Sequence, residues 1–166
     1  QTCALPICEI QDALAGDFLA TMERFRGSPY LQAAATAFVK EWARNSLKTD
    51  DGKPLMLDDE QAWAVASDGG DVLVAARAGS GKTRVLVTRA IFLMRHCGLT
   101  KGELLLLAFN RDAADEMRGR LKRALGDNVP HVMTFHALAH ALVHPEEKIV
   151  FDESQAEKRL SRAVQS

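Results

Sequence analysis

The residues with the clearest chemical pattern form a glycine-rich stretch, Ala76-Arg77-Ala78-Gly79-Ser80-Gly81-Lys82-Thr83. It matches the phosphate-binding pattern G-x-x-x-x-G-K-[S/T], except that Ala76 stands where the first glycine is usual. Glycine at 79 and 81 lets backbone N–H groups approach phosphate oxygens without a Cβ in the way. Lys82 is expected to face the β- and γ-phosphates, and the Thr83 hydroxyl to ligate Mg²⁺. The alternative is a glycine-rich turn that contains Lys-Thr by chance.

The flanking segments supply the elements that such a loop needs. The apolar run 72–76 predicts a strand buried on both faces of a parallel sheet. A helix over about 82–96 follows, with Gly98 as its C-terminal stop. A helix N-terminus directly after the loop presents N–H groups to an anion.

The same alternation continues towards the C-terminus. Residues 104–109 predict a second buried strand, and Asn110 can cap a helix that ends at Gly126. Residues 131–134 predict a third short strand, followed by a helix over about 135–143. Strands that alternate with helices indicate βαβ units, so the sequence predicts an α/β domain with a parallel sheet.

The residues before the loop are expected to be mainly helical. Apolar side chains recur at helical spacing over 10–26 and again over 29–46. The polar stretch 48–54 reads as a linker, and Asp58 as the N-cap of a short helix. We therefore expect a helical extension and linker over 8–56, ahead of the α/β domain that starts at 57.

Composition places the chain among ordinary globular proteins, with 47% apolar and 26% charged residues. Between residues 82 and 124 there are 10 basic and 4 acidic residues, a balance that suits a polyanionic partner or a solvated helix face. No apolar run is long enough to span a membrane, and no secretion signal is evident. The three cysteines show neither metal-ligand nor disulfide spacing, so a cytoplasmic location is expected.

Three further motifs carry a resemblance to a known family. The run Leu57-Asp58-Asp59-Glu60-Gln61-Ala62-Trp63 lies upstream of the loop, where it resembles the Q motif of UvrD/Rep-type superfamily 1 DNA helicases. The resemblance implies that Gln61 reads the adenine of ATP, which its carboxamide donor and acceptor suit. The alternative is a capping box between Asp58 and Gln61, and both roles can coexist. The implied ATP contacts are Gln61, Ala76, Arg77, Ala78, Gly79, Ser80, Gly81, Lys82, Thr83 and Arg84, with Lys82 and Thr83 catalytic and Thr83 the magnesium ligand.

Two runs downstream resemble the family's motifs Ia and Ib, which contact single-stranded DNA. Leu107-Ala108-Phe109-Asn110-Arg111 offers Phe109 for base stacking, and Asn110 and Arg111 for the DNA backbone. Thr134-Phe135-His136 offers Thr134 and His136 as donors to phosphate. The alternatives are that Phe109 and Phe135 are core residues while Asn110 and Thr134 are helix caps. Ligands of open α/β sheets sit at the carboxyl ends of strands, which favours contact at Phe109.

The resemblance also implies what this sequence lacks. The family's acidic Asp-Glu motif with its Gln, the second RecA-like domain and the arginines that reach the γ-phosphate are not found. Asp152-Glu153-Ser154-Gln155 resembles the acidic motif only superficially, and we interpret it as a helix start. Residues 57–144 are expected to form the first part of RecA-like domain 1A, and 145–166 the start of an inserted 1B subdomain. The wording of the motifs is closest to helicase IV-like members.

The expected activity is ATP-driven 3′→5′ translocation on single-stranded DNA and unwinding at duplex junctions, in repair or recombination. The parent protein would be the ATP hydrolase, and this chain alone is expected to be inactive. One rival is a P-loop phosphotransferase acting on a small molecule, and another is a partner-binding module with a vestigial ATP site.

The first seven residues form a separate question. One codon choice for residues 1–7 resembles the end of a common sequencing adapter, so we expect this stretch to be an adapter-derived artefact. The alternative is a genuine chain terminus.

Overall fold

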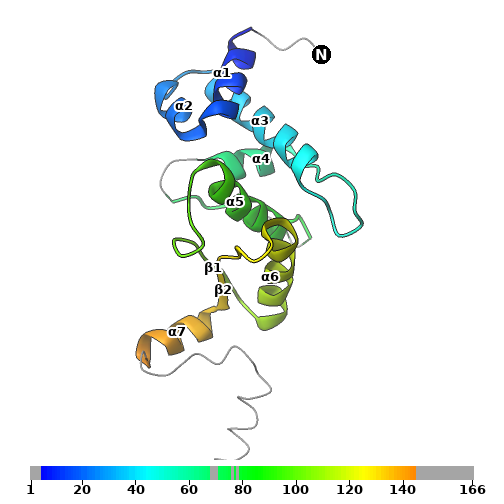
Figure 1. Cartoon of the computed structure of the whole chain (residues 1–166), viewed down its shortest axis with the longest axis vertical. Helices are drawn as coiled ribbons and strands as arrows, with labels where there is room; N and C mark the ends of the chain where they lie inside the picture. Colours follow the sequence, from blue (N-terminus) through cyan, green and yellow to red (C-terminus); the bar gives the residue numbers. More distant parts are fainter. Residues whose placement is uncertain (1–4, 68–70, 76, 78, 145–166) are drawn as a thin grey trace, which may run out of the picture.

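The computed structural model describes residues 5–67, 71–75, 77 and 79–144. Helices and strands follow each other as α1 Leu5–Gly16, α2 Phe18–Arg24, α3 Leu31–Ser46, α4 Asp59–Ala66, α5 Lys82–His96, β1 Leu105–Ala108, α6 Arg111–Leu125, β2 His131–Thr134 and α7 Phe135–Val143. In Figure 1 the extension α1–α3 lies at one end of the molecule and α7 at the other, with α4, α5, α6 and the strands between them. The predicted 1B segment 145–166, including the helix start at Asp152, lies outside the described residues.

The N-terminal extension is helical, as predicted, but it breaks where the pattern indicated one helix over 10–26. Asp17 adopts an extended backbone with φ −147°, and its side chain accepts a hydrogen bond from the Ala20 N–H at 3.0 Å. An Asp N-cap of this kind starts a new helix, because it satisfies a backbone donor that the preceding helix cannot. Within the stretch expected to be foreign, residues 5–7 begin α1, and Ile7 packs against the core. The cysteine spacing also misled, because Cys8 is disulfide-bonded.

An aromatic cluster joins the extension to α5. The Phe92 ring on α5 packs edge-on against Phe18 at 4.8 Å and against Trp42 at 5.1 Å between centroids. His96, one turn further along α5, contacts Phe38 at 5.4 Å and stacks on Phe92 at 4.8 Å. Phe92 is fully buried there. Because buried aromatic residues contribute so much apolar area, the extension and the α/β part share one core rather than behaving as separate units.

The sheet that the structure describes has two strands. β1 and β2 are parallel, and the register pairs Leu105 with His131 and Ala108 with Thr134. Helix α6 forms the crossover between them, starting at its Asn110 cap and ending at Gly126 with φ +63°. The predicted bounds of α5, α6, α7 and both strands are confirmed to within one or two residues, and the fold is a helix-rich α/β arrangement.

The strand expected over 72–76 is not formed in its described part. Residues 71–75 have no strand assignment, and the Leu73 side chain is 94% exposed. Ala76 lies outside the described residues. A strand of a parallel sheet needs hydrogen-bonded neighbours and helices on both faces, and the described residues pair only β1 with β2. The apolar composition was therefore insufficient to predict a buried strand.

Among the helices of the described part, none combines the length and apolar character required to cross a bilayer.

Candidate functional site

The glycine-rich loop has the backbone geometry that its glycines predict. Gly79 and Gly81 adopt left-handed conformations with φ +79° and +84°. The Ser80 N–H donates to the Arg77 carbonyl at 3.3 Å, which closes a tight turn. Side chains with a Cβ rarely adopt such angles, so these two positions favour glycine for conformational reasons. Ala76 and Ala78 lie outside the described residues.

Helix α5 begins directly after this turn without a side-chain cap. Its N-cap is Gly81, which has no side chain that could accept hydrogen bonds from the N–H groups of the first turn. The Lys82 ammonium donates to the Arg77 carbonyl at 2.6 Å and so lies against the loop. Thr83 is half-buried in the first turn, and Arg84 is exposed. An uncapped helix start with an ammonium group beside it is chemically suited to an anion.

Gln61 connects the short helix α4 to this loop. Its Oε1 accepts from the Asp58 N–H at 3.2 Å, and the Asp58 carboxylate accepts from the Gln61 N–H at 2.8 Å. The predicted capping box is therefore confirmed. The Gln61 Nε2 also donates to the Ser80 carbonyl at 3.2 Å. The same side chain thus caps α4 and contacts the loop, an arrangement that sequence spacing alone could not reveal.

A second contact between α4 and α5 was not anticipated from the sequence. The Arg89 guanidinium donates to the Ala64 carbonyl at 2.9 Å and to the Val65 carbonyl at 3.0 Å. Burial lowers the pKa of the Arg89 guanidinium from its ordinary value. These bonds satisfy carbonyls near the C-terminal end of α4, so α4 and the Gln61 side chain are held in a fixed position relative to α5.

The end of β1 presents an exposed aromatic side chain. Phe109 is 86% exposed, so the alternative that it belongs to the core is wrong. Asn110 caps α6, since its Oδ1 accepts from the Ala113 N–H at 2.9 Å. Arg111 is exposed in the first turn of the same helix. The predicted cap at Asn110 is confirmed, and Phe109 and Arg111 are both accessible from solvent.

The end of β2 repeats this arrangement. The Thr134 Oγ1 accepts from the Ala137 N–H at 3.2 Å and caps α7. Phe135 is 57% exposed, so it is not the core residue that one alternative required. His136 is exposed beside it. Because Ala108 and Thr134 are paired in the parallel register, the two strand-to-helix junctions lie next to each other at one edge of the sheet.

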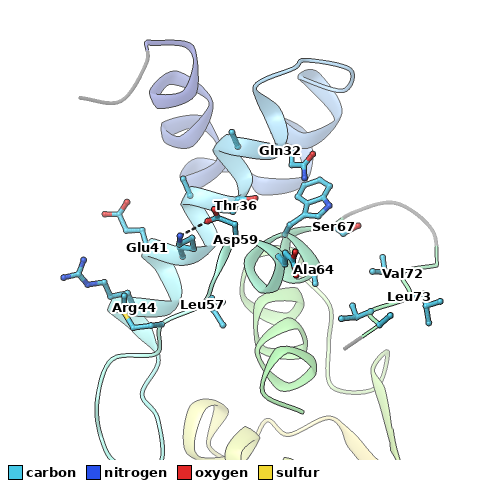
Figure 2. A pocket seen from close by; sticks show the side chains of 18 of the residues that line it. Gln32, Thr36, Glu41, Arg44, Leu57, Asp59, Ala64, Ser67, Val72 and Leu73 are labelled. Atoms are coloured by element: carbon cyan, nitrogen blue, oxygen red, sulfur yellow. Dashed lines mark hydrogen bonds and ion pairs between the residues drawn. The ribbon is translucent and has the colours of Figure 1, made fainter. Parts of the chain in front are cut away.

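A cleft of about 1090 Å³ lies away from these residues. Figure 2 looks into it: α3 and α4 line one side, and Val72 and Leu73 line the other. The ion pair between Lys40 and Asp59, 2.7 Å long, joins α3 to the start of α4 at its border. None of the described loop residues, 77 and 79–83, lines the cleft, so we do not assign a nucleotide to it.

A family comparison accounts for this combination of loop and strand ends. Residues 57–162 match the UvrD/REP helicase N-terminal domain. The chain belongs to the UvrD/REP helicase family. This confirms the resemblance drawn from the motifs, and it places the matched start of the UvrD/REP domain at Leu57, immediately before the α4 cap.

The similar proteins are named as DNA helicases. The chain is 39% identical over 119 residues to DNA helicase IV of Escherichia coli, covering 72% of this chain and 17% of the relative. It is 39% identical over 93 residues to DNA helicase II of Haemophilus influenzae, covering 52% of this chain and 13% of the relative. It is 40% identical over 83 residues to ATP-dependent DNA helicase UvrD1 of Mycobacterium tuberculosis, and the match covers 49% of this chain and 11% of the relative. The chain thus spans less than a fifth of the length of these UvrD/REP helicases.

Proposed function

We propose that this chain is the ATP-binding and single-stranded-DNA-contacting part of an ATP-dependent 3′→5′ DNA helicase. The observation that carries the proposal is the pairing of Ala108 with Thr134, which sets two exposed strand-to-helix junctions side by side in a chain that also has the glycine-rich loop. The expected domain is RecA-like, with residues 57–144 forming the first part of domain 1A. Duplex junctions are the expected sites of unwinding.

The loop is the proposed ATP site. The left-handed glycines and the start of α5 suit a polyphosphate, because the N–H groups of the first turn have no side-chain cap at Gly81. Lys82 would exchange its 2.6 Å bond to the Arg77 carbonyl for the β- and γ-phosphates, and Thr83 would ligate Mg²⁺. The bound magnesium would neutralise charge that develops on the phosphates.

Gln61 is proposed to link base recognition to the loop. Its carboxamide offers an NH2 donor group and a carbonyl acceptor, which complement the adenine N7 and N6 amino group. One Nε2–H donates to the Ser80 carbonyl and one lone pair of Oε1 accepts from the Asp58 N–H. The second N–H and the second lone pair would serve adenine, so base recognition and the contact with the loop can coexist.

The two junctions are the proposed DNA contact. The exposed Phe109 ring can stack on a base, and Arg111 can approach the phosphate backbone. Thr134 uses its hydroxyl oxygen as an acceptor in the α7 cap, which leaves the hydroxyl proton for a phosphate oxygen. His136 adds a further donor at the same edge.

The rival functions explain fewer of these features. A small-molecule phosphotransferase function does not explain the aromatic ring of Phe109, which is 86% exposed at the end of β1. A partner-binding module with a vestigial ATP site does not explain why Lys82 lies against a loop of left-handed glycines.

The deciding experiment measures ATP hydrolysis of the full-length protein with and without single-stranded DNA. We expect hydrolysis to rise when DNA is added, to disappear in Lys82→Ala, and to lose its DNA stimulation in Phe109→Ala while basal hydrolysis persists. Hydrolysis that is indifferent to DNA, but rises with a small phosphoryl acceptor, would instead favour the phosphotransferase.

A further inference from the structure

The segment predicted to be a linker folds back on α5 and α6 and covers a second cleft. An antiparallel bridge pairs Lys48 with Pro54, so residues 48–54 form a small hairpin. Between the hairpin and the two helices lies a cleft of about 540 Å³. Its charged lining residues are Lys48, Asp50, Arg84, Arg120 and Arg123. Four of these five are basic, so the cleft carries a positive charge.

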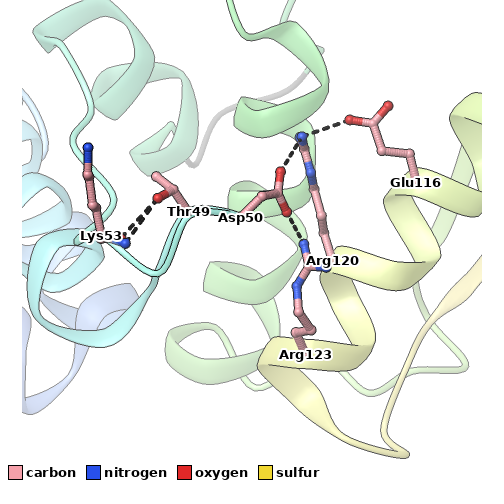
Figure 3. A network of polar contacts seen from close by, with 6 residues as sticks. All are labelled: Thr49, Asp50, Lys53, Glu116, Arg120 and Arg123. Carbon is pink, nitrogen blue, oxygen red and sulfur yellow. Dashed lines mark hydrogen bonds and ion pairs between the residues drawn. The ribbon is translucent and has the colours of Figure 1, made fainter.

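The single acidic residue of this lining is held by two arginines. The Arg120 guanidinium contacts Asp50 Oδ2 at 3.0 Å, and the Arg123 guanidinium contacts Asp50 Oδ1. Figure 3 shows both contacts, together with the Arg120 bond to Glu116 at 2.8 Å on the same helix. Each oxygen of one carboxylate thus accepts from a different guanidinium. Arginine pairs bind two oxygens of a phosphate group with the same geometry.

The contact is readily exchanged for another anion. The Asp50 side chain is 55% exposed and that of Arg123 is 62% exposed. Exposed ion pairs are screened by water and contribute little to stability, so displacing the carboxylate has a low cost. Within the described part of the chain no acidic side chain pairs with Lys48 or Arg84, which leaves positive charge for a dianion.

We propose that this cleft is a phosphate-binding site, separate from the glycine-rich loop, in which the Asp50 carboxylate occupies the position of the phosphate until a ligand displaces it. Arg120 and Arg123 bind the phosphate oxygens, and Lys48 supplies further charge from the hairpin. The ligand is a phosphate group, carried either by a nucleic-acid backbone or by a free phosphate or pyrophosphate ion. Binding moves the carboxylate of Asp50 away from α6 and loosens the hairpin on that helix.

The test uses the full chain with Lys82→Ala, which removes the ammonium group of the glycine-rich loop. Inorganic pyrophosphate and a short single-stranded oligonucleotide are titrated separately by calorimetry. Asp50→Asn should bind the ligand about fivefold more tightly, because no charged carboxylate then competes. Arg123→Gln should bind about tenfold more weakly, because a charge-assisted bond to phosphate is lost. Asp115→Asn is the matched control, since its ion pair with Arg118 lies on α6 outside the cleft.

The direction in which Asp50→Asn changes anion affinity distinguishes a binding site from a purely structural contact between the hairpin and α6. If the contact is purely structural, Asp50→Asn lowers the melting temperature and leaves anion affinity unchanged or weaker, and that result would overturn the proposal. If Asp50→Asn fails to fold, Arg123→Gln carries the test, and unchanged affinity there would overturn the proposal equally. If only pyrophosphate affinity responds to Asp50→Asn and Arg123→Gln, the source is the free ion; if only oligonucleotide affinity responds, the source is the nucleic-acid backbone. Neither result depends on the loop, so the proposed ATP site stands or fails separately.

Discussion

The Gln61 side-chain amide donates a hydrogen bond to the Ser80 carbonyl, so the cap of α4 and the glycine-rich loop share one residue. The Gln61 Oε1 accepts from the Asp58 N–H and the Nε2 donates to the loop, so both ends of the carboxamide make a contact. A Cβ placed on Gly81 would lie 3.6 Å from the same Nε2. The loop is thus positioned against α4 by direct contact rather than by chain connectivity alone.

Substitution at Gln61 separates its two roles. We expect Gln61→Ala to narrow the preference for ATP over GTP and to lower the free energy of unfolding by about 1 kcal/mol through the lost cap. Gln61→Glu is the matched variant, because a carboxylate can still accept from the Asp58 N–H but cannot donate to Ser80 or to adenine. Gln61→Glu should retain the free energy of unfolding of the unmodified protein and lose the preference for ATP over GTP. Melting temperatures and a nucleotide competition assay on both variants provide the check. An unchanged preference for ATP over GTP in both variants would show that Gln61 acts only as a helix cap.

Removal of the loop lysine should affect binding and spare the fold. Lys82→Ala is expected to abolish Mg·ATP binding in calorimetry, since the ammonium that faces the phosphates is gone. The Lys82 side chain is exposed, so the free energy of unfolding should change by no more than about 0.5 kcal/mol. Lys101→Ala, an exposed lysine outside the loop, is the control and should bind normally. Unchanged affinity in Lys82→Ala would contradict the phosphate-binding assignment.

The exposed ring at the end of β1 provides a test of stacking. Phe109→Ala in the full-length protein should weaken single-stranded DNA binding by roughly 1–3 kcal/mol and leave the melting temperature nearly unchanged, because the ring is not part of the core. Phe92→Ala is the contrasting control: its ring is buried, so it should cost about 3–5 kcal/mol of stability. Fluorescence anisotropy and thermal melts on both proteins make the comparison. A Phe109→Ala protein that melts like Phe92→Ala would show that the ring is structural.

The contact of Arg111 with DNA should appear in the salt dependence. Loss of one phosphate contact should reduce the slope of log affinity against log salt by about 0.7 for a single strand in Arg111→Ala. Arg44→Ala, on the exposed surface of α3, should leave the slope as in the unmodified protein. Affinity is measured at several salt concentrations for both variants. If Arg111→Ala leaves the slope of log affinity against log salt unchanged, Arg111 does not contact the DNA backbone.

Acid should weaken the packing of the extension on α5 through His96. Burial, with a smaller contribution from neighbouring Arg95, lowers the pKa of His96 below its ordinary value of 6.5. The unfolded chain therefore binds the proton more readily than the folded one, so stability is full above pH 6.5 and falls as the pH drops towards the folded pKa. The His96 Nε2 has no hydrogen-bond partner among the described residues, so protonation places an unpaired charge between aromatic rings.

His96→Phe tests this pH dependence directly. The substitution keeps an aromatic ring in the cluster but removes the titrating group, so melting temperatures below pH 6.5 should fall less steeply than in the unmodified protein. His131→Phe, at an exposed position on β2, is the control. Parallel pH profiles for His96→Phe and the unmodified protein would show that another group is responsible.

The sequence by itself determined the features that depend on neighbouring residues. The caps at Asp58, Asn110 and Thr134 and the stop at Gly126 were predicted and are found, because a cap is formed between residues three apart. The left-handed loop positions at Gly79 and Gly81 are likewise local, because glycine adopts positive φ without strain. The family, too, was readable from four short motifs in order.

Only the tertiary structure decided the features that depend on distant partners. The apolar run at Val72–Val74 predicted a strand, but a strand exists only with hydrogen-bonded neighbours, which sequence composition does not encode. Phe109 could equally have been core, and its exposure is set by where β1 ends relative to β2. The contact of Asp50 with Arg123 joins residues 73 positions apart, and the Gln61 bond to Ser80 joins residues 19 apart. Such contacts form because α4 packs on α5 and the 48–54 hairpin packs on α6, and no local sequence pattern records that packing.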